Sequence, residues 1–176
     1  MDFKIKVHWT TTNGIMSRLI RWVTKSKTSH SFVSIQVPET NLRLALTAEG
    51  EGFSAVPLQR YLKSNKLIYE AELIGLPADE SVVWLMEKYL GTDYDTGAAA
   101  LVTIREKFSF LWKKCKGFFR KILGDSGKVM CSESVIEMLQ HAGYTTVKEM
   151  VAEDTNAERL YQAALKHPEE FKFKQI

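Results

Sequence analysis

The chain has 176 residues, of which 45% are hydrophobic and 26% are charged, and its formal net charge is +3. This length and composition predict one domain with a sizeable core, and the small positive charge is too weak to predict nucleic-acid binding. Two cysteines are too few for a disulfide framework, and no run of about 18 apolar residues predicts a membrane-spanning helix.

The first half of the chain is typical of a series of strands with one helix near the start. Residues 3–9 alternate between apolar and polar, which predicts a half-buried strand with His8 on its solvated side. Apolar residues then recur at helical spacing over 15–23. Further strands are expected over 30–37, 42–49, 53–58 and 66–73, with a helical turn over 58–62. The N-terminus lacks the apolar segment of a signal peptide, so we expect a cytoplasmic protein as synthesised.

The second half is dominated by helical patterns. Asp79 is expected to cap a helix that runs to Leu90, and residues 94–101 open another helix. A helix from Cys131 is expected to end before Gly143, and a capping box over 155–158 opens the last helix. Strands come first and helices later, so the predicted class is α+β with an antiparallel sheet, in a single domain over 1–176.

Cys131 stands where a short apolar segment changes into a helical pattern. A thiol in the first turn of a helix lies among backbone N–H groups that have no helical partner, at the positive end of the helix dipole. Both effects favour the thiolate and so the reactivity of the cysteine. A small buried hydrophobic residue is the alternative interpretation, because free cysteines are among the most buried residues.

A thiol nucleophile needs an imidazole base and a third polar group that orients the imidazole ring. His141 lies ten residues after Cys131 on the same expected helix, so it is at the wrong end. His8 is expected to be solvated, and His167 is expected near the end of the C-terminal helix. His30 remains, at the first residue of a strand that can hold its ring rigidly.

The orienting group is expected on the strand next to that of His30. Glu49 ends the strand that would pair with it, and Glu51 is the alternative; taken alone, Glu49 is also explained as a solvated charge at a strand end. The chain has no HExxH, CxxC or GxSxG motif, so we predict neither a metal site nor a cofactor nor a serine nucleophile.

Four segments together resemble a known family: SHSFV (29–33), AEG (48–50), GTDYD (91–95) and MCSESV (130–135). They are similar to the circularly permuted NlpC-type papain-fold amidases, the YiiX-like group, in which histidine and acid precede the cysteine. The resemblance implies a papain-like antiparallel sheet or barrel packed against helices. It implies that Cys131 is the nucleophile, His30 the base and Glu49 the orienting acid, and that Tyr94 and Asp95 support the site.

The chain departs from this family in three respects. The early Gly-Asp-Ile/Leu segment of the family is absent, and Met130 and Ser134 replace a tyrosine and a leucine beside the cysteine. An insert at about 103–128 is rich in aromatic residues, and its basic residues include Lys113, Lys114, Lys116, Arg120 and Lys121.

The insert has two interpretations. It is either a basic aromatic helix on an anionic membrane or over an acyl substrate, or an amphipathic helix that packs on the core with its lysines in solvent. The apolar residues at helical spacing include Cys115, for which we predict a packing role.

The sequence therefore predicts a thiol hydrolase or acyltransferase that forms an acyl-enzyme. Two substrate classes are open: an amide such as that of a cell-wall peptide, and a lipid acyl ester or lipid-linked amide. A hypothesis of another class is a catalytically idle binding module on the same fold that holds a membrane or a protein partner.

Overall fold

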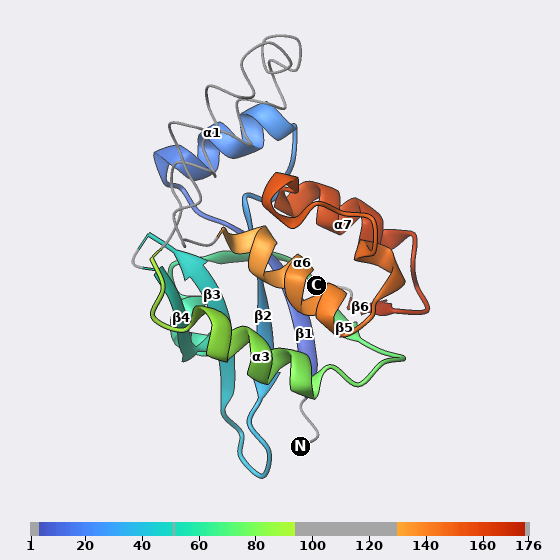
Figure 1. Cartoon of the computed structure of the whole chain (residues 1–176). Coiled ribbons are helices and arrows are strands. Elements are labelled where there is room, and N and C mark those ends of the chain that lie inside the picture. Colours follow the sequence, from blue (N-terminus) through green and yellow to red (C-terminus); the bar gives the residue numbers. More distant parts are fainter. Residues whose placement is uncertain (1–3, 51, 94–129, 175–176) are drawn as a thin grey trace.

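The structure is a computed structural model that describes residues 4–50, 52–93 and 130–174 (Figure 1). The described part is α+β, with a six-stranded antiparallel sheet and five α-helices. The expected site residues Tyr94 and Asp95, the alternative acid Glu51, Cys115 and the basic insert at 103–128 lie outside the described residues.

Five of the six strands were predicted from the sequence. The strands are β1 (Ile5–Thr11), β2 (His30–Gln36), β3 (Arg43–Glu49), β4 (Gly52–Pro57), β5 (Lys66–Leu73) and β6 (Phe171–Phe173). They form one sheet in the order β4-β3-β2-β1-β5-β6. The strand β6 was not predicted, because its three residues are too few for a periodic pattern; it pairs with β5 at the sheet edge.

The helices follow the predicted positions, with small differences at their ends. They are α1 (Ile15–Thr24), α2 (Leu58–Tyr61), α3 (Asp79–Tyr89), α6 (Cys131–His141) and α7 (Ala157–Leu165), with 3-10 turns at Thr145–Val147 and Ala152–Asp154. Asp79 was expected to cap α3 but is its first residue. The last helix is capped by Asn156, whose side chain accepts from the Arg159 N–H at 2.9 Å, and not by Thr155.

The main core lies between the sheet and the helices α3 and α6, which lie across one of its faces (Figure 1). Val33 and Ile35 of β2 pack there with Val135 and Ile136 of α6. A smaller cluster on the opposite face is built around Phe32 of β2 and includes side chains of β3 and α2. Both faces of β2 are therefore buried, which holds this strand and its first residue in a fixed position.

The prediction of a solvated His8 was wrong. His8 is completely buried; its ring stacks on Phe32 with centroids 4.8 Å apart, and its Nε2 lies 2.7 Å from Ser34 Oγ. Burial lowers the pKa of His8 to about 4, and the nearby Glu70 carboxylate offsets this only in part. The polar residues of β1 alternate as predicted, but the second cluster extends over the face on which His8 lies.

None of the described helices is both long and apolar enough to cross a membrane.

Candidate active site

The helix α6 begins at Cys131, as predicted. Met130 has extended backbone angles (φ −91°, ψ 159°), and its N–H donates to Glu133 Oε2 at 2.9 Å. Ser132 Oγ donates to the Thr155 carbonyl at 2.5 Å, and this contact fixes the first turn of α6. These contacts hold Cys131 at a helix start, where its own backbone N–H has no helical acceptor.

His30 is the first residue of β2 and is 9% exposed. Its ring lies near those of Phe32 and Tyr61, at centroid distances of 6.1 and 6.3 Å, on the sheet face opposite α6. The starts of β2 and α6 meet, and there the imidazole of His30 and the thiol of Cys131 come within hydrogen-bonding reach. Two groups some hundred residues apart in the sequence are thus side by side.

Cys131 is a free cysteine of intermediate exposure. Burial by itself would raise the pKa of its thiol, but the charge and hydrogen bond of His30 lower the pKa below its ordinary value. The backbone N–H groups of Ser31 and Ser132 donate to the sulfur and lower the pKa further. Three donors from two different elements therefore favour the thiolate.

The complementary effect acts on the imidazole. Burial by itself would lower the pKa of His30, but the Cys131 sulfur and then the Glu49 carboxylate outweigh it and raise the pKa above its ordinary value. Each member of the pair thus stabilises the charged form of the other. Both shifts favour the ion pair of thiolate and imidazolium over the neutral pair of thiol and imidazole.

The group in direct contact with the outer side of the His30 ring is Thr47. Its Oγ1 lies 2.8 Å from His30 Nε2, while the nearest Glu49 oxygen is 3.9 Å from the same nitrogen. With Nε2 engaged by the hydroxyl, Nδ1 is the ring nitrogen left for Cys131. Thr47 stands two residues before Glu49 on the same face of β3, so strand alternation makes it a candidate for the contact beside Glu49.

Glu49 reaches the imidazole mainly through its charge. The Tyr61 hydroxyl donates to Glu49 Oε1 at 2.5 Å and holds the carboxylate beside the site. Burial, followed by the charge and hydrogen bond of Glu49, raises the pKa of Tyr61, so this phenol stays protonated. The sequence did not suggest Tyr61, which lies in the short helix α2.

The other histidines lie away from the thiol. His141 is at the far end of α6, as predicted; its Nδ1 is 2.9 Å from Ser81 Oγ, and its ring stacks on Trp84. His167 pairs with Glu169 at 2.8 Å beyond the end of α7. Within the described ranges, no group of three or more His, Cys, Asp or Glu side chains is arranged to hold a metal ion.

Glu133, two residues after the thiol, is an acid with an unusual pKa. Burial, together with the nearby carboxylates of Glu137 and Glu153, raises its pKa to about 7, although the Met130 N–H and Lys88 act in the opposite direction. The raised pKa means that the folded protein binds a proton here between pH 4.5 and about 7, while the unfolded chain does not. Ionisation of Glu133 therefore costs stability as the pH rises through this range.

We expect Glu133→Gln to raise the free energy of unfolding by about 1–3 kcal/mol at about pH 8 and to change it little at about pH 5. The amide removes the buried charge and keeps an oxygen that can accept from Met130. Urea unfolding at the two pH values measures the effect, with Glu149→Gln on the exposed surface as the control. An equal effect at both pH values would contradict the raised pKa.

No protein-family model matches the chain, and no curated protein matches it with statistical significance.

Proposed function

We propose that the protein is a papain-like thiol hydrolase or acyltransferase in which Cys131 is the nucleophile and His30 the base. The observation that carries this proposal is the pairing of a helix-start thiol with a buried imidazole, each shifting the pKa of the other toward the charged pair. A purely structural cysteine does not need a charged partner, since a buried thiol in apolar surroundings is normally neutral and inert.

In the first half of the reaction, the Cys131 thiolate attacks the carbonyl carbon of an amide or ester. The carbonyl π electrons move to the oxygen, and the backbone N–H of Cys131, which has no helical acceptor, is the natural donor to this oxyanion. When the tetrahedral intermediate collapses, the bond to the leaving amine or alcohol breaks. The proton on His30 Nδ1 goes to that leaving group, which leaves a thioester on Cys131 and a neutral imidazole.

In the second half, the neutral imidazole removes a proton from water or from another acceptor, which attacks the thioester. The carbon–sulfur bond breaks, the thiolate returns, and the proton held by His30 restores the starting ion pair. Throughout the cycle Thr47 and Glu49 hold the ring: the hydroxyl fixes Nε2, and the carboxylate stabilises the imidazolium.

The papain-like assignment of the fold is part of this proposal. It is supported by the chain order of histidine, acid and cysteine, and by a cysteine helix that packs on the antiparallel sheet carrying the other two residues. This is the order of the permuted family that the sequence resembles.

The substrate class is also proposed from the sequence. A peptide amide and a lipid acyl ester or lipid-linked amide both supply the carbonyl that the mechanism needs. The basic residues of the insert favour the lipid, since they could contact an anionic membrane: Lys113, Lys114, Lys116, Arg120 and Lys121.

The test is acylation of the thiol by activated acyl compounds. We expect p-nitrophenyl acetate or p-nitrophenyl octanoate to give a burst of nitrophenolate and an acyl adduct that peptide mass spectrometry locates on Cys131. Cys131→Ser should lower the rate by at least about a thousandfold, as removal of a nucleophile does in related mechanisms. Cys115→Ala serves as the matched control and should keep the burst.

The pattern of substrates then separates the candidates. Faster acylation by the octanoyl ester than by the acetyl ester would favour a lipid acyl group, and turnover of a peptide anilide would favour a peptide amide. Failure of every acyl compound to modify Cys131, with the fold intact by circular dichroism, would contradict the enzyme proposal and leave the idle binding module.

A further inference from the structure

The helix α1 lies beyond the end of the sheet, away from α3 (Figure 1), and it is attached to the protein by its polar side. Ser17 is its only buried residue. Ser17 Oγ lies 2.6 Å from Ser29 Oγ and 3.0 Å from Thr11 Oγ1, so a cluster of hydroxyls joins the helix to β1 and to the residue before His30. This is the reverse of an ordinary surface helix, whose apolar stripe faces the core.

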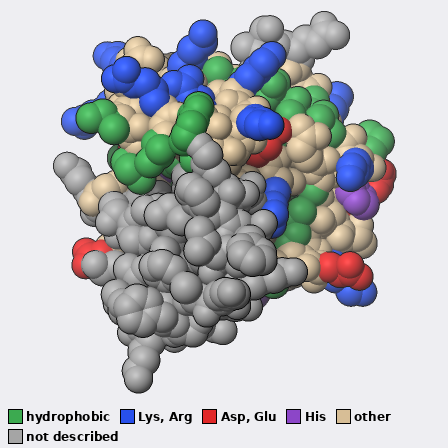
Figure 2. All heavy atoms as spheres, turned by 90° about the horizontal axis from the view of Figure 1, so that it is seen from above, with side chains coloured by type: hydrophobic (Ala, Val, Ile, Leu, Met, Phe, Trp, Pro, Cys, Tyr) green, Lys and Arg blue, Asp and Glu red, His purple; other side chains and the backbone are tan. Residues whose placement is uncertain are grey.

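Four of the six large apolar side chains of α1 are exposed, while Ile20 and Val23 are partly buried. Ile15 is 81% exposed, Met16 44% and Leu19 40%, and Trp22 on the next turn is 65% exposed. Figure 2, which looks down on this end of the molecule, shows hydrophobic side chains gathered directly beside lysines and arginines. Large apolar side chains that cluster on one exposed face mark an interaction surface more often than single ones do.

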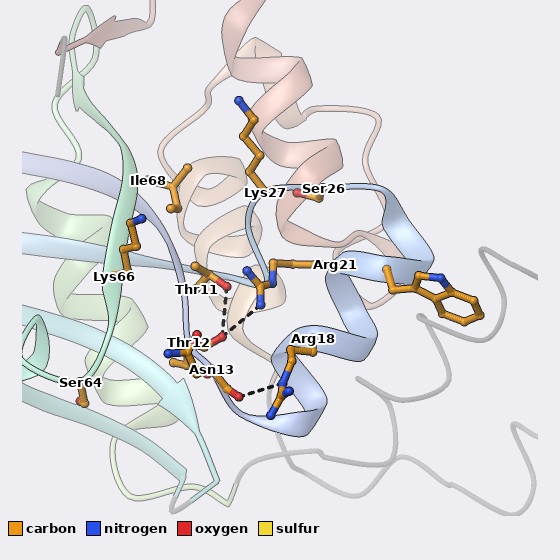
Figure 3. Close-up of a pocket in the computed structure, with 11 residues that line it drawn as sticks. Thr11, Thr12, Asn13, Arg18, Arg21, Ser26, Lys27, Ser64, Lys66 and Ile68 are labelled. Atoms are coloured by element: carbon orange, nitrogen blue, oxygen red, sulfur yellow. Dashed lines mark hydrogen bonds between the residues drawn. The ribbon is translucent and has the colours of Figure 1, made fainter.

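A basic groove of about 680 Å³ runs beside the helix (Figure 3). It lies between α1, the end of β1 and the start of β5, and the four cationic side chains that line it are Arg18, Arg21, Lys27 and Lys66. Arg18 donates to the Asn13 carbonyl at 3.0 Å, and Arg21 to the Thr12 carbonyl at 3.4 Å. These contacts orient both guanidinium groups, and no carboxylate of the described residues pairs with either of them.

The electrostatic surroundings of the groove are positive. The described residues supply no carboxylate within ion-pair distance of its four cations, and the stretch 14–28 contains no acidic residue. The acid at its border is Glu158 of α7, which accepts a hydrogen bond from Ser26 Oγ. An outward apolar stripe beside a cationic groove is the pattern of helices that lie in the interface of an anionic membrane.

We propose that α1 docks the protein on an anionic membrane surface, with lipid phosphate groups in the groove and the stripe of Ile15, Met16 and Leu19 among the acyl chains. The proposal concerns residues distinct from the basic insert and does not depend on catalysis. Because Ser17 and Ser29 join the helix to the residue before His30, docking would hold the candidate active site close to the lipid headgroups.

The experiment is cosedimentation of the full chain with vesicles of phosphatidylcholine alone or mixed with phosphatidylserine. We expect binding to the mixed vesicles only. The Arg18→Gln/Arg21→Gln variant should lose approximately 30-fold in affinity, because each basic residue near an anionic surface contributes about fivefold to binding, and two are removed. The matched control is Lys148→Gln/Lys172→Gln, two exposed lysines on other elements, which should bind like the wild type.

The apolar stripe is tested separately by Ile15→Ser/Leu19→Ser. This variant should also lose at least about tenfold in affinity for the mixed vesicles, since the two aliphatic side chains that would enter the membrane are removed. Leu42→Ser/Val83→Ser, at two exposed apolar residues outside α1, should not lose affinity. Quenching of Trp22 fluorescence by brominated lipid, absent from Trp22→Phe, would place the helix itself at the membrane.

Several results would overturn the proposal. One is binding that survives both α1 variants and disappears in Lys113→Glu/Lys114→Glu, which would assign the membrane contact to the insert. Another is saturable binding of inorganic phosphate without binding to vesicles, which would make the groove a site for small anions. A large drop in melting temperature, or loss of a dimer, in Ile15→Ser/Leu19→Ser would show that protein covers the stripe.

Discussion

Replacing His30 with alanine is expected to slow the reaction of Cys131 with iodoacetamide at about pH 6 by roughly 10- to 100-fold. The imidazolium supplies the largest effect that lowers the pKa of the thiol, and the burial that remains raises it. At about pH 6 an ordinary thiol is less than about 1% ionised, whereas a thiolate paired with imidazolium is largely formed. The larger fraction of thiolate raises the alkylation rate, but by less than the fraction itself, because a less basic thiolate is a weaker nucleophile.

The measurement is the alkylation rate of Cys131 as a function of pH, followed by mass spectrometry in a Cys115→Ala background. In the protein with His30, the rate should rise with a midpoint well below about pH 8.5; in His30→Ala the midpoint should lie at or above that value. His141→Ala is the matched control, because this histidine lies on the same helix at its far end. Equal profiles with and without His30 would end the ion-pair interpretation.

The central pair of the site could be predicted from the sequence because local patterns determine both members. A helix start at Cys131 and a strand start at His30 each follow from apolar periodicity, and elimination of the remaining histidines leaves one candidate base. The sequence could not rank Thr47 above Glu49 as the partner of the His30 ring. A carboxylate is the expected partner of an imidazole, and the sequence gives no distances. The structure reverses their order, at 2.8 and 3.9 Å from Nε2.

What could not be predicted depends on packing between distant elements. The alternation in β1 indicates one buried face, and only the cluster around Phe32 and Tyr61 explains why the other face and His8 are buried too. The helical period of α1 likewise predicts an amphipathic helix but not the direction of its apolar side. The contact of Ser17 with Ser29, through hydroxyls that carry no periodic signal, sets that direction.

A second large effect is expected from Gly52→Ala at the start of β4. Gly52 has φ +108°, and a Cβ built there would lie 2.3 Å from the Thr92 carbonyl oxygen. The Phe53 N–H donates to that same oxygen at 2.8 Å, and the Gly91 N–H donates to the Phe53 carbonyl at 3.1 Å. Alanine must therefore push one backbone segment away from the other and also hold a left-handed conformation, at a cost of about 2–4 kcal/mol.

This destabilisation corresponds to a fall in melting temperature of about 5–15 °C for a domain of this size. Gly50→Ala is the matched control: it lies two residues away in the same hairpin, has no atom within 4 Å of a built Cβ, and does not have a positive φ. It should change the stability by no more than about 0.5 kcal/mol. Equal melting temperatures for the two variants would contradict the close approach of Gly52 to Thr92.

The same glycine also affects the candidate site, because Gly52 is the register partner of Glu49 at the end of β3. A displaced β4 would move the carboxylate that raises the pKa of His30 and accepts from Tyr61. Under conditions where Gly52→Ala is fully folded, we therefore expect the alkylation of Cys131 to slow by a few-fold, because a displaced Glu49 stabilises the His30 imidazolium less. Gly50→Ala should leave that rate unchanged, so the pair of variants separates a local effect on the site from a general loss of stability.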